Sequence, residues 1–188
     1  MPIDLTLPAD YERLIAMMSE VTVERPVFLL DGGSGAGKTQ LSETLLPRLQ
    51  QRFDGIQLLS IENFYQGWDG LAEAADHLVD GILASSTPGY LAWDWHRGRP
   101  DRWVELDPAA PLLIEGCGTI TTRSVEYSDL GIWLERPEEQ RKQLALARDG
   151  DTFAPWWDAW AESERKLRAK HPPLELADVK VTFCDSLG

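Results

Sequence analysis

Cysteine is scarce in this sequence, with two residues, Cys117 and Cys184, among 188. Two isolated thiols cannot form the disulfide framework of a small secreted domain, and they suit a reducing compartment. No apolar run approaches the roughly 18 residues that a membrane-spanning helix requires. The acidic N-terminal segment also lacks the apolar core of a signal peptide. The sequence therefore predicts a cytoplasmic protein with no membrane partner.

Positive charge is also in short supply, because 18 Lys and Arg stand against 31 Asp and Glu and leave a net charge of −13. Such a charge repels polyanions, so we expect no nucleic-acid partner. Only three histidines are present and none clusters with cysteine, which argues against a zinc site. Hydrophobic residues nevertheless make up 43% of the chain, enough for a substantial core.

The apolar residues fall into short continuous runs that alternate with helical patterns. Continuous apolar runs are typical of parallel strands buried on both faces. Five are expected, at 26–33, 55–64, 111–116, 129–135 and 177–183. Helical periodicity covers 11–20, 38–52, 71–85, 137–148 and 154–170, with a kink expected at Pro47.

This alternation predicts an α/β protein of doubly wound topology: a mostly parallel five-stranded sheet with helices on both faces. The length suits a single domain spanning 1–188. Within it, residues 62–106 are expected to form an insertion between the core units, and residues 136–170 a helical lid.

A phosphate-binding signature follows the first apolar run. Residues 32–39 have the sequence GGSGAGKT, which matches GxxxxGK followed by Ser or Thr, the Walker A pattern of P-loop NTPases. Glycines let consecutive N–H groups turn toward a phosphate, and the following helix adds its positive end. Lys38 would reach the β- and γ-phosphates, while the Thr39 hydroxyl would join a Mg²⁺ shell. We therefore expect ATP and Mg²⁺, and the predicted nucleotide contacts are Gly33, Ser34, Gly35, Ala36, Gly37, Lys38 and Thr39.

Other features narrow the class of P-loop protein. The chain has no NKxD stretch of the kind that reads guanine in GTPases. The run at 111–116 ends in one carboxylate, Glu115, followed by glycine, whereas AAA-type and transporter ATPases need a second acid there. At the ligand edge of a parallel sheet, Glu115 is expected to contact Mg²⁺ or its water together with Thr39. The alternative is a strand-end acid with no role.

The order of these motifs resembles the uridine kinase and phosphoribulokinase group. GGSGAGKT, IENFY after the second run, LLIEG at the third and an RxxxxxxRD stretch carry the resemblance, which covers about 26–149. The resemblance is weaker in the lid and the C-terminal third. It implies an ATP-dependent kinase that transfers the γ-phosphate to a hydroxyl of a small metabolite, nucleoside-like or sugar-like.

The resemblance also assigns acceptor-site residues. Glu62 stands where the group has an aspartate that acts as general base, and Asp69 or Asp94 are the alternatives for that role. Tyr65 matches an aromatic residue that flanks the acceptor. Asp94 resembles an acid that binds sugar hydroxyls, and His96 would assist it.

Two arginines follow the fourth run at a spacing of seven residues. Arg141 and Arg148 would therefore share one helical face, and their guanidinium groups could neutralise charge on the transferring phosphoryl group. Arg136 and Lys142 are weaker candidates for the same role. A solvated basic helix face is the alternative.

The distribution of charge bears on the acceptor. Residues 53–96 contain no Lys or Arg and seven Asp or Glu, whereas residues 136–170 contain eight of the basic residues. A phosphorylated acceptor would need cations near its phosphate, so we expect an unphosphorylated one, either neutral and polyhydroxylated or cationic. Trp68, Trp93 and Trp95 lie in or beside this region, where an aromatic face could stack on a base or sugar or pack in the core. Trp156 and Trp160 are one helical turn apart, which indicates core packing for that pair.

Two rival interpretations remain at the level of sequence. One is a regulatory or degenerate kinase that binds ATP without turnover, because Glu62 departs from the aspartate of the group. The other is a P-loop hydrolase within a larger assembly. The partners expected from the sequence are a small-molecule acceptor and, as an open alternative, further copies of this chain in a homo-oligomer.

Overall fold

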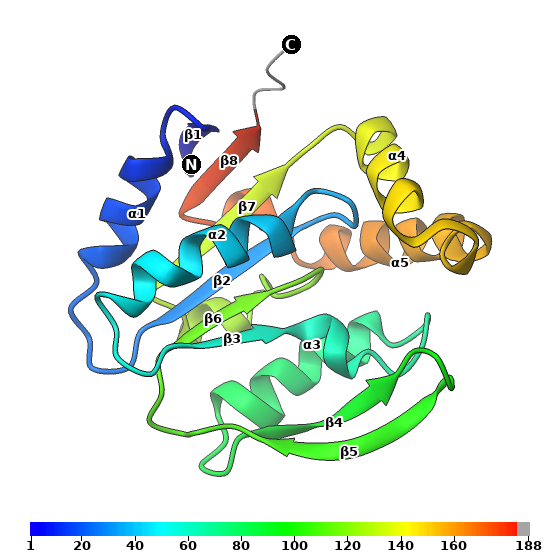
Figure 1. Ribbon diagram of the computed structural model, residues 1–188, viewed down its shortest axis with the longest axis horizontal. Helices are drawn as coiled ribbons and strands as arrows, with labels where there is room; N and C mark the ends of the chain where they lie inside the picture. Colours follow the sequence, from blue (N-terminus) through cyan, green and yellow to red (C-terminus); the bar gives the residue numbers. More distant parts are fainter. Residues whose placement is uncertain (184–188) are drawn as a thin grey trace.

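Six parallel strands form the central sheet of the computed structural model, which describes residues 1–183 (Figure 1). Their order across the sheet is β1-β8-β7-β2-β6-β3. The strands are β1 (Ile3–Leu7), β2 (Val27–Gly32), β3 (Gln57–Ser60), β6 (Leu112–Glu115), β7 (Leu130–Glu135) and β8 (Val179–Phe183). The predicted α/β class and parallel sheet are confirmed, and all five predicted strands are present.

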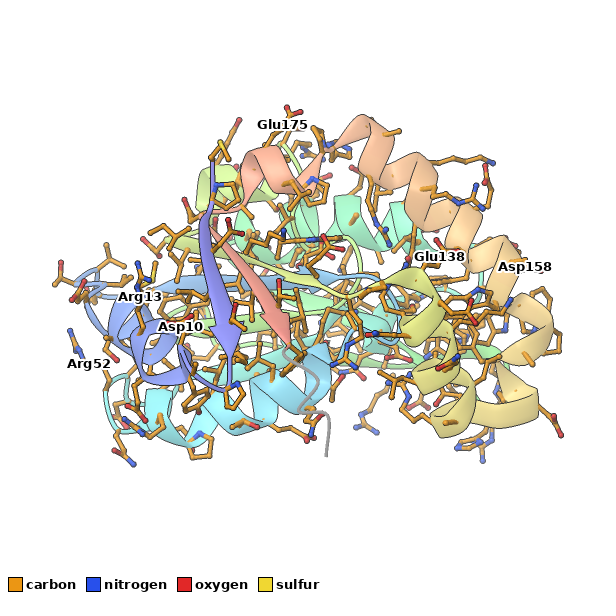
Figure 2. The ribbon with its side chains drawn as sticks, turned by 90° about the horizontal axis from the view of Figure 1, so that it is seen from above. Asp10, Arg13, Arg52, Glu138, Asp158 and Glu175 are labelled. Atoms are coloured by element: carbon orange, nitrogen blue, oxygen red, sulfur yellow. The ribbon has the colours of Figure 1, made fainter. Side chains whose placement is uncertain are left out.

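The predicted count of five strands was one short, because β1 was missed. Within residues 1–183 this strand pairs only with β8 and lies at the edge of the sheet, alongside β8 in Figure 2. Its sequence IDLTL mixes polar and apolar residues, and only Leu5 and Leu7 are buried. An edge strand of this kind lacks the continuous apolar run that marks the central strands.

Helices cover both faces of the sheet (Figure 1). They are α1 (Tyr11–Ser19), α2 (Lys38–Gln50), α3 (Leu71–His77), α4 (Glu138–Asp149), α5 (Trp157–Lys170) and α6 (Pro173–Leu176), with a π-helical turn at Leu78–Leu83. Phe28 and Leu30 of β2 face a core shared with α1 and α2, whereas Val27 and Leu29 face a second core with α3 and α5. No helix within residues 1–183 is long and apolar enough to cross a bilayer.

Two segments extend from this framework. The insertion contains a 3₁₀ turn (Ile61–Phe64), α3 and an antiparallel hairpin of β4 (Gly89–Asp94) and β5 (Arg99–Glu105). Helices α4 and α5 make up the segment predicted to be a lid. Short turns at Gly150–Thr152 and Ala154–Trp156 join them, at the end of the sheet toward which β2 and β7 point (Figure 1). Cys184 lies outside the described residues.

Candidate active site

The phosphate-binding loop lies at the point where the sheet reverses its winding. β2 has β6 on one side and β7 on the other, and the loop leaves its carboxyl end. Gly35 and Gly37 adopt φ values of +79° and +101°, which other residues rarely tolerate. The N–H groups of Gly35, Gly37 and Lys38 donate to no acceptor within residues 1–183. A Cβ at Gly35 would overlap the backbone carbonyl of Arg141, so α4 packs directly on the loop.

Lys38 opens α2 with its ammonium inside the loop. Nζ donates hydrogen bonds to the carbonyls of Gly32 and Gly33 at 2.8 and 3.1 Å and lies 3.3 Å from Sγ of Cys117. Burial alone lowers the pKa of this ammonium, but the negative groups around it, Glu115 among them, reverse the shift and raise the pKa. Lys38 is therefore a fixed cation beside the unpartnered loop N–H groups.

Thr39 and Glu115 come together as the sequence predicted. The Thr39 hydroxyl, in the first turn of α2, donates to Oε1 of Glu115 at the end of β6, at 3.4 Å, and both side chains line the same cavity. Within the described residues no three Asp, Glu, His or Cys side chains are arranged to hold a metal by themselves. A divalent cation would therefore share Thr39 and Glu115 with phosphate oxygens and water, as Mg²⁺ commonly does. The donor set fits Mg²⁺ on that basis.

A cavity of about 390 Å³ joins the loop to the insertion and the lid. Glu62, on the 3₁₀ turn after β3, lines it together with Tyr65. Desolvation by the cavity walls raises the pKa of the Glu62 carboxyl, although the side chain keeps contact with solvent through the opening. Asp69 and Asp94, the alternatives for the general base, do not line this cavity. Glu62 is therefore the predicted base that the fold brings to the loop.

Tyr65 is buried against the lid, and its hydroxyl donates to the carbonyl oxygen of Cys117 at 2.7 Å. Asp94 and His96 instead lie in the turn of the β4–β5 hairpin. Asp94 accepts the backbone N–H groups of His96 and Arg97, both at 3.0 Å, and the His96 side chain is exposed. The structure thus places Tyr65 at the cavity but leaves Asp94 and His96 outside it.

The two predicted arginines occupy different surroundings. Arg148 lines the cavity and is held by both carboxylate oxygens of Asp149, at 2.8 and 2.7 Å. Arg141 is buried behind the loop, where it donates to the carbonyls of Ser34 at 2.9 Å and Arg136 at 3.3 Å. The prediction that both arginines face the phosphates is therefore wrong for Arg141, because its side chain holds the backbone of the loop instead.

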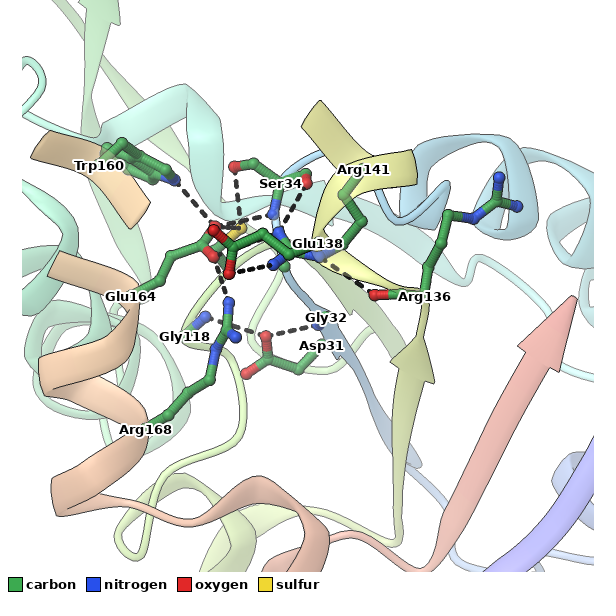
Figure 3. A network of polar contacts seen from close by, with 12 residues as sticks. Asp31, Gly32, Ser34, Gly118, Arg136, Glu138, Arg141, Trp160, Glu164 and Arg168 are labelled. Atoms are coloured by element: carbon green, nitrogen blue, oxygen red, sulfur yellow. Dashed lines mark hydrogen bonds and ion pairs between the residues drawn. The ribbon is translucent and has the colours of Figure 1, made fainter. Parts of the chain in front are cut away.

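Sequence reasoning missed Glu164, a buried carboxylate on α5 that reaches the loop (Figure 3). Its Oε1 accepts the Ser34 N–H at 2.7 Å and Trp160 Nε1 at 3.0 Å, while Arg168 and Arg141 form ion pairs with Oε2. Burial alone would raise the pKa of this carboxyl, but Arg168 and the Ser34 N–H hold it below its ordinary value. The i, i+4 spacing of Trp160, Glu164 and Arg168 was the available signal.

Aromatic rings form the wall between the insertion and the lid. The Trp68 ring centroid lies 4.8 Å from that of Trp95, 5.1 Å from Phe153 and 6.1 Å from Trp160. All four line the cavity, so Trp160 serves the site as well as the core. Trp156 stacks on the outer part of this cluster, 5.8 Å from Trp68.

The comparisons with known proteins agree with this geometry at the level of fold. A structure described as a "possible uridine kinase" from Bacillus stearothermophilus superposes with a TM-score of 0.68 at 18% identity, over 93% of this chain and 98% of that one. A protein from Silicibacter sp. TM1040, provisionally named a fructose transport system kinase, has a TM-score of 0.57 at 18% identity, over 96% of this chain and all of the other. No protein-family model and no curated protein matches the chain. The fold is a uridine kinase-like P-loop fold.

Proposed function

We propose that the protein is an ATP-dependent phosphotransferase that phosphorylates a hydroxyl of a small, unphosphorylated metabolite. One observation carries the proposal: a single cavity brings Glu62 to the same space as the phosphate-binding loop and the Thr39–Glu115 pair. These are the parts that phosphoryl transfer needs, namely a phosphate cradle, metal-directed groups and a base for the attacking hydroxyl. The kinase names of the two structural neighbours support the same class.

In the proposed mechanism, the free N–H groups of Gly35, Gly37 and Lys38 cradle the phosphates. Lys38 contributes a compact positive charge, and bound Mg²⁺ supplies further charge neutralisation where Thr39 and Glu115 would hold it. Arg148 lies on the lid side of the cavity, where its guanidinium can meet charge that develops on the transferring group.

Glu62 acts on the acceptor. It accepts the proton of the attacking hydroxyl, while the new O–P bond forms and the bond between the γ-phosphorus and the β–γ bridging oxygen breaks. The raised pKa of its carboxyl brings the base nearer to neutrality. The acceptor side carries no Lys or Arg between residues 53 and 96, which supports an acceptor without a phosphate.

The test is a transfer assay with γ-labelled ATP, Mg²⁺ and a panel of nucleosides, sugars and amino alcohols. Label appearing in an organic acceptor supports the proposal. ATP binding with no transfer to any acceptor would point instead to a regulatory or degenerate kinase. Release of inorganic phosphate alone would point to a hydrolase.

A further inference from the structure

We propose that the acceptor is an alcohol that also carries a protonated amine. This inference rests on the proposed function, since it concerns the acceptor half of the same cavity. That half is formed by Glu62, Tyr65, Trp68, Trp95, Phe153 and Trp160.

The polar hydrogens of this half are already committed to the protein. The Tyr65 hydroxyl donates to the carbonyl of Cys117, at 2.7 Å. Trp95 Nε1 donates to the backbone oxygen of Glu62, at 3.2 Å, and Trp160 Nε1 donates to Glu164, at 3.0 Å. A pyrimidine base presents carbonyl oxygens that need donors, so these walls suit it poorly.

The polar side chain of this half that remains uncommitted is the acceptor Glu62. Glu115 and Asp149 line the same cavity but already accept from Thr39 and Arg148. The cations that act on Glu62 are also engaged: Arg148 donates to Asp149, and Lys38 donates to the loop carbonyls. A ligand that donates hydrogen bonds through hydroxyl and ammonium groups matches this arrangement.

The aromatic wall of the cavity also suits a cationic ligand. Trp68 stacks on Phe153 and Trp156, and Trp95 and Trp160 pack at an angle to it, so these rings form an aromatic wall of the cavity that Glu62 also lines. Indole faces attract cations, and the attraction strengthens when water is excluded. Carboxylate and indole together therefore favour a cation over a neutral molecule of equal size.

The reaction remains a balanced phosphoryl transfer. The acceptor oxygen forms a bond to the γ-phosphorus, the bridging bond to ADP breaks, and the hydroxyl proton passes to Glu62. The ammonium group keeps its proton and its charge throughout, so it serves only recognition. The product is a phosphate ester that still carries an ammonium group.

The experiment compares acceptors in isosteric pairs, with Mg²⁺ and saturating ATP. The pairs are 2-(dimethylamino)ethanol, which is protonated at neutral pH, against 3-methylbutan-1-ol, and glucosamine against glucose, with uridine as a neutral nucleoside. We expect kcat/KM to favour the charged member of each pair by about tenfold or more. Transfer to uridine or to the neutral members with equal or greater efficiency overturns the inference while leaving the proposed kinase activity intact.

A binding measurement decides the inference if no acceptor is phosphorylated. Tryptophan fluorescence is titrated with 2-(dimethylamino)ethanol, protonated at neutral pH, and with 3-methylbutan-1-ol in the presence of a non-hydrolysable ATP analogue. Preferential binding of the protonated amine supports a cation site even if the kinase proposal fails. Equal binding, or none of either compound, overturns it.

Variants of Trp68 test whether this residue accounts for the preference for the charged ligand. Trp68→Leu should reduce the preference for the charged member by about tenfold, in transfer or in binding, and Trp68→Phe should restore part of it. Trp103→Leu is the matched control, because Trp103 is 52% exposed on β5 and does not line the cavity. An unchanged preference in a folded Trp68→Leu protein contradicts the proposed cation site.

Discussion

At the scale of single residues, Lys38 is the side chain on which the proposed chemistry most depends. Lys38→Ala should reduce phosphoryl transfer by a factor on the order of 10² or more, because it removes the fixed charge of the phosphate cradle. Steady-state kinetics and ATP titration measure the effect. Lys180→Ala is the control, since Lys180 lies on β8 outside the cavity. Full activity in Lys38→Ala would remove the loop from the mechanism.

Glu62→Gln should lower turnover by roughly 10²- to 10⁴-fold while leaving ATP affinity nearly unchanged, because the amide cannot accept the proton. Glu62 must be ionised to act, and the pKa of its carboxyl is raised above 4.5. Turnover should therefore rise with pH through that raised pKa and level off above it. A pH–rate profile checks the acidic limb, which Glu62→Gln should abolish. Asp69→Asn, a change outside the cavity, should keep both rate and profile.

The sequence predicted the positions of site residues near the loop more accurately than those of residues on the hairpin and the lid. Lys38 and Thr39 open α2 after the loop that leaves β2, Glu62 lies on the turn after β3, and Glu115 ends β6, so the carboxyl edge of a parallel sheet collects them. Residues on the hairpin and lid are positioned by tertiary packing, and spacing alone cannot tell which way they point. For that reason the sequence predicted Arg141 at the phosphates, whereas the structure places it behind the loop.

At the scale of elements, α4 packs directly on the phosphate loop at Gly35. Gly35→Ala should destabilise the protein by about 1–3 kcal/mol or more and weaken ATP binding, because its Cβ would overlap the Arg141 carbonyl. Thermal unfolding and ATP titration measure both effects. Gly98→Ala separates packing from backbone strain, since Gly98 also has positive φ but open space around it. Equal losses in the two variants would contradict a role for packing.

The docking of α5 on the loop should depend on pH through Glu164. Because the pKa of this carboxyl is lowered, its stabilising contribution is complete above about pH 4.5, its ordinary pKa, and is lost as pH falls through the lowered value. The protection factor of the Ser34 amide, which compares its exchange rate with the intrinsic rate at the same pH, should therefore fall at acidic pH. Glu164→Gln should lower this protection factor at neutral pH and make it less dependent on pH. Identical exchange in both proteins would rule out Glu164 as the link.

Most elements could be predicted because their signals are local. The central strands are continuous apolar runs, and the helices repeat buried residues at regular spacing. One element was missed for a reason outside the local sequence: β1 is half polar because an edge strand needs little burial. The predicted helix over 38–52 is present as α2, which runs through Pro47 to Gln50 with Leu45 and Leu49 buried on either side of the proline.

At the scale of the whole molecule, two strands separate the β1 edge from the strand that carries the phosphate loop. Removal of residues 1–7 should cost about 3–6 kcal/mol of unfolding free energy, the value of burying Leu5 and Leu7. ATP affinity should change little, because β8 and β7 lie between β1 and the loop strand β2. Denaturant unfolding and ATP titration test the two halves of this expectation. A loss of ATP affinity in a folded truncated protein would contradict it.

The same edge has a consequence for synthesis on the ribosome. β1 is made first, yet its only partner in the sheet, β8, is the last strand of the described chain. A nascent chain can assemble β2, β3, β6 and β7 with the phosphate loop while β1 still waits unpaired. Completion of the sheet is then coupled to the arrival of residues 179–183, so premature termination would leave two strands, not one, outside the fold.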